Sequence, residues 1–403
     1  MNSLWRNREF NLLWAGQALS DLGSTVATLA APLLVLAITG SAVQAGLVGT
    51  VGLIVQLICR LPAGVLTDRV DRRRALRACD AVRVVAYAIL TAAVATGNAG
   101  LALIIAVVAV DGACVTLFDT TERAALRSIV PAPQLPDAIA RNEARVYGAS
   151  LAGPPLGGLL FGLGHAWPFL GNTVSFLASL AGVSMIRKPL QEKRVEPAAG
   201  HAAALAEGIR FVLTEPFLRA VLLIAAPLNF AINGAIFAII LNLQRHGTPP
   251  GVIGLTETIV SAGGLAGAVA APAIQRRLPL ARLVQLLCWT TPVVLALSAA
   301  LAESLAAAVP VAIAVAVGPA INAALFGYQA AITPDHLQGR VVSVVFVAAK
   351  SVAVSAPLVA GLLVTAWGGS PTLLFFAASV LISAGTATAG AGIRTMKALE
   401  ATA

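Results

Sequence analysis

Several ionisable side chains stand inside long apolar runs of this sequence, where a charge is costly and is therefore a candidate for function. Asp21 lies about ten residues into the first run and Asp111 about eleven residues into the fourth. Glu257 and Lys350 lie in the eighth and eleventh runs. Because burial favours the neutral form of a carboxyl group, such an acid can trade a proton for a cationic or polar solute. We predict that Asp21, Asp111, Glu257 and Lys350 include the groups that couple proton movement to solute movement.

A second interpretation stays open for each of these residues. Asp21 and Asp111 can instead be water-exposed or hydrogen-bonded acids with no coupling role, and Glu257 can be a solvated acid at the mouth of a cavity. Lys350 can neutralise a nearby acid or contact an anion, since a buried ammonium group needs a partner or water.

The elements that must hold these residues are about twelve apolar stretches of roughly 20–28 residues, long enough to cross a bilayer as helices. The chain is 58% hydrophobic and only 11% charged, whereas a soluble domain averages about 25% charged residues. We predict an all-α membrane protein with two pseudo-symmetric six-helix bundles. The twelve transmembrane helices are expected at residues 11–39, 43–65, 75–97, 100–126, 137–163, 166–186, 217–243, 251–273, 280–302, 304–330, 340–366 and 371–392.

Positive charge is distributed unevenly between the connections of these helices. Nearly all of the 27 Lys and Arg residues lie at the two ends of the chain or on every second connection, and Arg245 is the one on an opposite connection. Arg83 and Lys350 are exceptions within apolar runs. This is the positive-inside pattern, which predicts that both termini are cytoplasmic. The net charge of +9 then marks a membrane face and not a nucleic-acid-binding surface.

The chain divides into two similar halves. The string Gly153-Pro154-Pro155-Leu156-Gly157-Gly158 corresponds to Ala356-Pro357-Leu358-Val359-Ala360-Gly361, and the tripeptides that precede the same two helices correspond at the same offset. Apolar residues at helical spacing from Ala202 to Leu213 predict an amphipathic helix on the inner membrane surface. The predicted domains are a six-helix bundle at 1–187, a cytoplasmic linker at 188–216 and a six-helix bundle at 217–403.

The connection after the second helix carries the strongest motif. It places an acid ahead of a cationic cluster, so its arginines can bridge to neighbouring helix ends in one arrangement of the bundles and release in another. An ordinary positive-inside anchor is the alternative. The predicted conformational switch consists of Gly64, Asp68, Arg69, Arg72 and Arg73.

The fifth helix carries a second motif, rich in Gly and Pro. Such residues give a kink and a thin, closely packed helix face, and packing alone is one interpretation of them. The motif residues are Gly153, Pro154, Gly157 and Gly158.

Both motifs resemble signatures of the major facilitator superfamily. The first resembles G-x-x-x-D-R-x-G-R-R and departs from it at Asp71, where the family usually has Gly, so the turn is expected to differ. The second resembles the antiporter motif G-x-x-x-G-P-x-x-G-G, which is associated with exporters. The resemblance implies twelve helices around a central cavity lined by the first, fourth, seventh and tenth helices, with transport by alternating access.

The resemblance is strongest for the macrolide-efflux and enterobactin-exporter-like branch. The segment Leu13–Gly23 looks like its first helix, and Asp80-x-x-Arg83 looks like its D-x-x-R, in which we expect the two side chains to pair on one helical face. The fourth helix departs by lacking the Arg of many proton-coupled antiporters. By position on the cavity helices, the residues expected to contact substrate are Gln17, Asn229, Asn233, Asn322, Tyr328, Phe230, Phe237 and Phe326. For each of these, packing or hydrogen bonding between helices is the alternative role.

These observations predict a secondary efflux transporter of the bacterial cell membrane that exports a small amphipathic compound (a drug, a macrolide-like compound or a siderophore) in exchange for protons. A monomer is expected, with the lipid bilayer, protons and a small-molecule substrate as partners. The chain shows no nucleotide-binding loop, catalytic triad or His/Cys cluster, so no enzyme activity, catalytic residue, cofactor or metal is expected. The alternatives are an importer of a nutrient or metal–siderophore complex, and a non-transporting receptor or scaffold.

Overall fold

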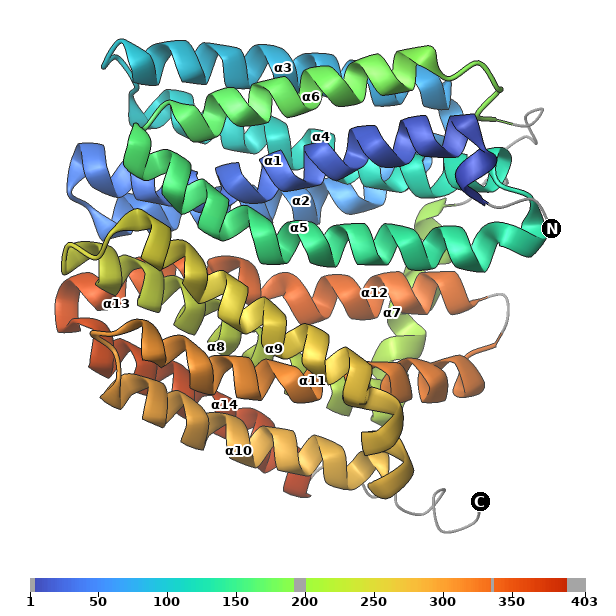
Figure 1. The fold of residues 1–403 in the computed structure, drawn as a ribbon. Coiled ribbons are helices and arrows are strands. Elements are labelled where there is room, and N and C mark those ends of the chain that lie inside the picture. Colours follow the sequence, from blue (N-terminus) through green and yellow to red (C-terminus); the bar gives the residue numbers. More distant parts are fainter. Residues whose placement is uncertain (1–3, 192–200, 335–336, 390–403) are drawn as a thin grey trace. The chain divides into compact units, whose positions relative to one another are not determined.

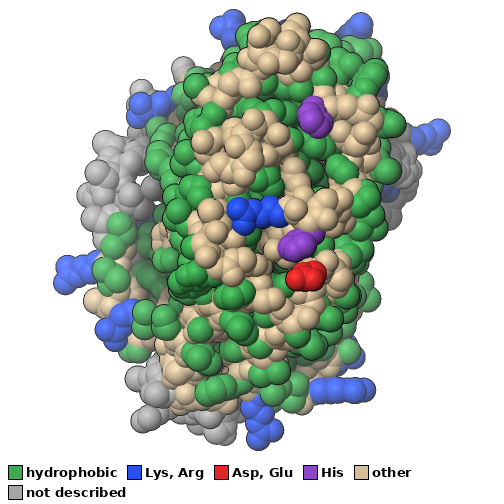
Figure 2. Space-filling view, turned by 90° about the vertical axis from the view of Figure 1, so that its left-hand side faces the viewer, with side chains coloured by type: hydrophobic (Ala, Val, Ile, Leu, Met, Phe, Trp, Pro, Cys, Tyr) green, Lys and Arg blue, Asp and Glu red, His purple; other side chains and the backbone are tan. Residues whose placement is uncertain are grey.

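The computed structural model describes residues 4–191, 201–334 and 337–389, apart from the side chains of a few of them. Within these residues every regular element is a helix. Twelve of the described helical segments are long and apolar enough to cross a membrane, as the sequence predicts. Hydrophobic side chains exposed on the outside, such as Val269 (78% exposed) and Leu163 (77% exposed), suit contact with lipid. Figure 2 looks from the left of Figure 1 onto the ends of the helices, where few charged side chains lie near the centre of the view.

The chain forms two compact units, the first comprising residues 1–197 and 248–258 and the second residues 198–247 and 259–403. In unit 1, α1 lies between α5 and α6, while α4 packs against both α2 and α3 (Figure 1). Its helices are α1 (Arg8–Thr39), α2 (Ala42–Arg69), α3 (Arg72–Ala95), α4 (Leu101–Ile129), α5 (Leu135–Leu163) and α6 (Trp167–Met185).

In unit 2, α8 packs against α12, α13 and α14, and α10 packs against α11 and α14. The predicted amphipathic segment forms α7, which packs against α12. The helices of this part of the chain are α7 (His201–Thr214), α8 (Pro216–Arg245), α9 (Pro250–Arg277), α10 (Leu280–Ala300), α11 (Ala308–Ile332), α12 (Gln338–Ser351), α13 (Ala356–Trp367) and α14 (Gly369–Ala389).

The helix ends differ from the predicted ones by a few residues, with one larger correction. The predicted continuous helix at 340–366 is broken: α12 ends at Ser351, a 3-10 turn covers Ala353–Ser355, and α13 begins at Ala356. Pro357 explains the break, because proline has no N–H and its ring clashes with the carbonyl four residues earlier.

Short turns join consecutive helices of unit 1. At Gly40 the backbone adopts φ 67°, and its N–H closes the last turn of α1 by donating to the Leu36 carbonyl. Glycine adopts this left-handed conformation without steric cost, so the chain can reverse at once into α2.

Candidate functional site

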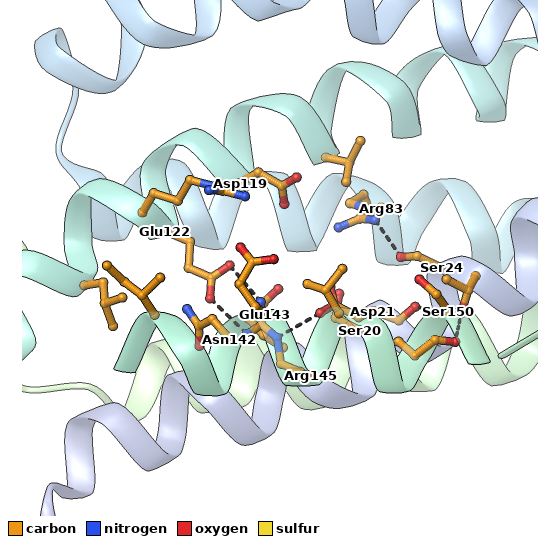
Figure 3. A pocket seen from close by; sticks show the side chains of 18 of the residues that line it. Ser20, Asp21, Ser24, Arg83, Asp119, Glu122, Asn142, Glu143, Arg145 and Ser150 are labelled. Carbon is orange, nitrogen blue, oxygen red and sulfur yellow. Dashed lines mark hydrogen bonds and ion pairs between the residues drawn. The ribbon is translucent and has the colours of Figure 1, made fainter. Parts of the chain in front are cut away.

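A cavity of about 370 Å³ lies within unit 1, lined by α1, α3, α4 and α5. Its walls carry eight ionisable groups, and Figure 3 shows Glu122, Arg145 and Asp21 facing one another. The charged lining residues are Asp21, Arg83, Asp119, Glu122, Arg123, Arg127, Glu143 and Arg145.

Helical periodicity places these side chains on common faces. Gln17, Asp21 and Ser24 are spaced by four and three residues along α1, so they share the face that lines the cavity. Gly153 and Gly157 lie on the α5 face that packs against α1, and a Cβ at either position would meet Thr25 or the Val26 backbone. The small residues therefore let α1 approach α5 closely and bring the two polar faces together.

Arg145 of α5 is the centre of the cavity's charge network. Its Nε lies 2.8 Å from Oδ2 of Asp21, on α1. Its two terminal nitrogens donate to the two carboxylate oxygens of Glu122, on α4, at 2.9 and 3.2 Å. One guanidinium thus joins three helices, and the bidentate geometry with Glu122 is the stronger of its two contacts.

Burial distinguishes the two acids. The Arg145 and Glu122 side chains are 5% and 6% exposed, whereas the Asp21 side chain is 24% exposed. A buried guanidinium must be neutralised, and Glu122 can do this alone. Asp21 therefore supplies a second negative charge at a position that water in the cavity can reach, and Asp119, exposed on α4, adds another acid to the lining.

A second ion pair lies next to this network. Arg83 of α3, only 2% exposed, donates to Asp111 of α4 at 2.7 Å and to the Ser24 hydroxyl at 3.0 Å. Its guanidinium also lies 3.8 Å from the centre of the Phe176 ring. Asp111 is thus a partner of Arg83 and is not among the residues that line the cavity. Arg83 and Ser24 both line the cavity, and the hydrogen bond from Arg83 to Ser24 connects the second ion pair to the cavity wall.

The predicted pairing of Asp80 with Arg83 is wrong. Asp80 instead accepts a hydrogen bond from the Ser179 hydroxyl at 2.6 Å, and Gln17 donates to that hydroxyl at 2.8 Å. Both side chains contact α6, but the acid of Arg83 comes from α4, so each polar group finds its partner on another helix. Gln17, predicted to contact substrate, is among the lining residues, but it is only 3% exposed and its amide is bound to Ser179.

The other two coupling candidates lie elsewhere. Glu257 is half-buried on α9, within residues 248–258 of unit 1, and is not among the residues that line the cavity. Lys350 lies near the end of α12 and donates to the Asn229 side chain at 3.0 Å, within unit 2. The partner of Lys350 is therefore a neutral amide on α8.

The predicted switch motif spans the end of α2 and the start of α3. Asp71, where the family motif has Gly, caps α3 by accepting from the Arg74 backbone N–H at 2.8 Å. Arg72 donates to the Ala124 and Leu190 carbonyls, both at 3.1 Å, and Arg73 donates to the Lys188 carbonyl at 2.7 Å. The motif thus holds the end of α4 and the segment after α6. The remaining motif residues are Gly64, Arg69 and Asp68, whose side chain lies outside the described part of the structure.

The Gly/Pro motif runs through an unbroken α5. The side of the helix that bears Pro154 and Gly158 meets the first turns of α9. A Cβ at Gly158 would collide with the Pro250 backbone, and one at Gly254 would collide with the backbone of Pro154. The motif serves close packing along both sides of α5.

The remaining predicted substrate contacts lie in unit 2, on α8 and α11. Phe230 is buried against Phe376, with ring centres 5.2 Å apart, and Tyr328 packs against Phe217 at 4.3 Å. Besides accepting from Lys350, Asn229 donates to a carbonyl of its own helix, as Asn233 does. Phe237 is half-buried, whereas Asn322 and Phe326 are exposed.

Sequence reasoning missed Glu122, Asp119 and Arg145 as site residues. Glu122 and Arg145 lie in the parts of α4 and α5 nearest the basic connections, where charge is expected as a membrane anchor. One signal could have indicated them: Asp119 and Glu122 share a helical face, and so do Arg141 and Arg145 on the next helix.

Comparison with known proteins identifies relatives along most of the chain. The family model of the Major Facilitator Superfamily matches residues 13–357. The multidrug efflux pump Tap of Mycolicibacterium fortuitum is 27% identical over 379 residues, covering 89% of this chain and 90% of its own length. Tap of Mycobacterium tuberculosis (strain H37Rv) is 28% identical over 294 residues, covering 68% of this chain and 67% of its own length.

Solved structures share the fold. A bacterial homologue of the human lysosomal transporter Spinster superposes with a TM-score of 0.74 at 14% identity, covering 99% of both chains. A bacterial homologue of the iron transporter ferroportin superposes with a TM-score of 0.68 at 17% identity, covering 96% of this chain and 99% of the other.

Proposed function

Because the chain belongs to the Major Facilitator Superfamily and is a multi-pass transporter of the bacterial cell membrane, we propose that it exports a small amphipathic compound in exchange for protons. The family and the efflux-pump relatives imply a transporter rather than an enzyme. Export, proton exchange and the class of cargo are the parts that need testing.

The observation that carries the proposal is the sharing of Arg145 between Asp21 and Glu122 inside a cavity lined by four membrane-spanning helices. Intramembrane charges persist where they are paired and where transport or coupling needs them. Asp21 is the more exposed of the two acids and contacts Arg145 through a single nitrogen. Breaking the Asp21–Arg145 contact therefore costs less free energy than breaking the Glu122–Arg145 contact.

Proton binding and local geometry are coupled at this point. A proton on Asp21 removes its attraction to Arg145, which then rests on Glu122 alone. The α1–α5 contact loses an ion pair while the α4–α5 contact keeps its own. Protonation thus changes the relative stability of two helix arrangements, as alternating access requires.

The departure of α4 from the family pattern fits this scheme. The Arg that many proton-coupled antiporters carry on this helix is absent, yet Arg83 of α3 and Arg145 of α5 both bind acids of α4. Guanidinium groups therefore reach the α4 acids from the two neighbouring helices.

Two observations favour export over import: the similarity to efflux pumps and the Gly/Pro motif of α5. The relatives that cover most of the chain are described as multidrug efflux pumps. The Gly/Pro motif of α5, associated with exporters, is used for close packing against α1 and α9. A cavity of about 370 Å³ with mixed apolar and charged walls suits a small amphipathic cargo.

The test is accumulation of ethidium and erythromycin in cells that lack their main pumps, with and without this protein, before and after a protonophore. Lower accumulation that the protonophore abolishes is expected. Asp21→Asn should abolish the gradient-dependent part, whereas Asp137→Asn, at an exposed acid outside the cavity, should not. Higher accumulation would overturn export, and full activity of Asp21→Asn would overturn the coupling assignment.

A further inference from the structure

A second hollow lies in unit 1, apart from the charged cavity. It is an open groove of about 920 Å³ at the turn between α2 and α3. Arg69 and Arg74 lie at this groove together with apolar side chains, among them Leu66, Ala78 and Leu117.

Helix packing explains why the groove exists. α2 packs against α1 and α4, whereas α3 packs against α4 and α6. The two helices are joined by the short turn at Val70 and Asp71 and share α4 as a neighbour. They therefore form a wedge whose floor includes Leu117 of α4.

The end of the groove at the turn is positively charged. The side chains of Arg69 and Arg74 are exposed there. Asp71 is the acid among the lining residues, and its Oδ1 is used in capping α3. Arg72 and Arg73 of the same turn donate to the carbonyls of Ala124, Leu190 and Lys188.

Away from the turn, α3 presents an exposed apolar stripe. Ala78 lines the groove, and Val82, Val85 and Ile89 follow at helical spacing with 46%, 58% and 52% of their surfaces exposed. With a rise of 1.5 Å per residue the stripe is roughly 16 Å long. That is about half of the ~30 Å hydrocarbon core, the thickness of one leaflet. Across the wedge, Leu66 and Ile58 of α2 are 42% and 66% exposed.

We propose that this groove binds an anionic phospholipid of the cytoplasmic leaflet, with its phosphate between Arg69 and Arg74 and one acyl chain along the α3 stripe. The cytoplasmic side follows from the distribution of Lys and Arg. The cationic end and the leaflet-length apolar stripe match the two parts of such a lipid. The inference does not depend on export, on cargo or on proton coupling.

The test uses the full-length protein in a neutral detergent with added lipid. Native mass spectrometry counts bound molecules of phosphatidylglycerol, with phosphatidylcholine of the same chains as the neutral comparison, and thermal unfolding reports stabilisation. Arg74→Ala should weaken phosphatidylglycerol binding at least about fivefold, the effect of losing one basic contact near a membrane surface. Arg77→Ala is the matched control, because Arg77 is exposed one turn further along α3 but does not line the groove.

A second variant tests the acyl-chain position with every charge unchanged. Ala78→Phe fills the groove and should also weaken binding, while leaving the elution volume of the purified protein unchanged. Equal loss in Arg74→Ala and Arg77→Ala would show a diffuse charge effect and overturn the site. Full binding by Ala78→Phe, equal binding of phosphatidylcholine, or the same stabilisation by inorganic phosphate alone would overturn the lipid assignment.

Discussion

Removing the Glu122 carboxylate should destabilise the protein more than removing that of Asp21. Glu122 and Arg145 are 6% and 5% exposed and make a bidentate contact at 2.9 and 3.2 Å. Breaking a buried pair on one side costs about 3–5 kcal/mol, because the remaining charge stays buried. Because Asp21 still contacts Arg145 in the variant, Glu122→Gln should lower the free energy of unfolding by about 3 kcal/mol, the low end of that range.

Asp21→Asn should cost less. Asp21 is 24% exposed, contacts one nitrogen of Arg145 and leaves that guanidinium paired with Glu122. The contact is an ion pair without hydrogen-bond geometry, and an ion pair that solvent reaches contributes about 1 kcal/mol or less. Glu122 is thus expected to matter more than Asp21 for the stability of the fold. Asp21 is expected to matter more for proton coupling, because it is the acid to which we assign the proton.

Equilibrium unfolding by denaturant in mixed micelles, combined with double-mutant cycles against Arg145→Gln, measures both pairs. The coupling energy should be larger for Glu122 with Arg145 than for Asp21 with Arg145, and Asp137→Asn should be close to neutral. Equal effects of the two acid variants, or a coupling below about 0.5 kcal/mol for Glu122, would refute the buried bidentate pair.

Three further outcomes follow from close contacts elsewhere in unit 1. Gly158→Ala should reduce transport because its Cβ meets the Pro250 backbone, whereas Gly162→Ala, with open space around it, should not; a transport assay at matched expression compares them. Arg83→Met should lower the free energy of unfolding by about 3 kcal/mol. Arg83→Lys should lower it by less, because the positive charge next to Asp111 is kept. Unfolding by denaturant measures both variants, and a smaller cost for Arg83→Met than for Arg83→Lys would contradict the Arg83–Asp111 pairing. Arg72→Ala should leave the protein inserted but slow transport, because two carbonyl contacts are lost; unchanged turnover would reduce the α2–α3 turn to a topological anchor.

The twelve helices could be predicted from the sequence because apolar length alone determines where a chain crosses a bilayer. The ends of the helices are harder to predict, because a helix can continue through polar residues beyond the apolar run that identifies it. The break between α12 and α13 shows a limit of this reasoning. Pro154 is accommodated within an unbroken α5, whereas the corresponding Pro357 lies in the first turn of α13, just after a 3-10 turn.

The candidate site could be predicted only in part. Asp21 and Gln17 were identified because polar residues deep in an apolar run are costly. Glu122 and Arg145 were missed because they lie toward helix ends, where charge has an ordinary explanation. Their pairing depends on how α4, α5 and α1 are packed, which the spacing along one helix does not encode. The same reason accounts for the wrong pairing of Asp80 with Arg83.

The most direct test of the central claim uses purified protein in proteoliposomes with an imposed pH gradient and a fluorescent substrate taken from the efflux panel. Substrate movement against the direction of proton flow, lost in Asp21→Asn and kept in Asp137→Asn, is the predicted result. Transport by the wild-type protein that continues unchanged when the gradient is abolished, or that is equally fast in Asp21→Asn, would contradict proton-coupled export through the Asp21–Arg145–Glu122 cluster.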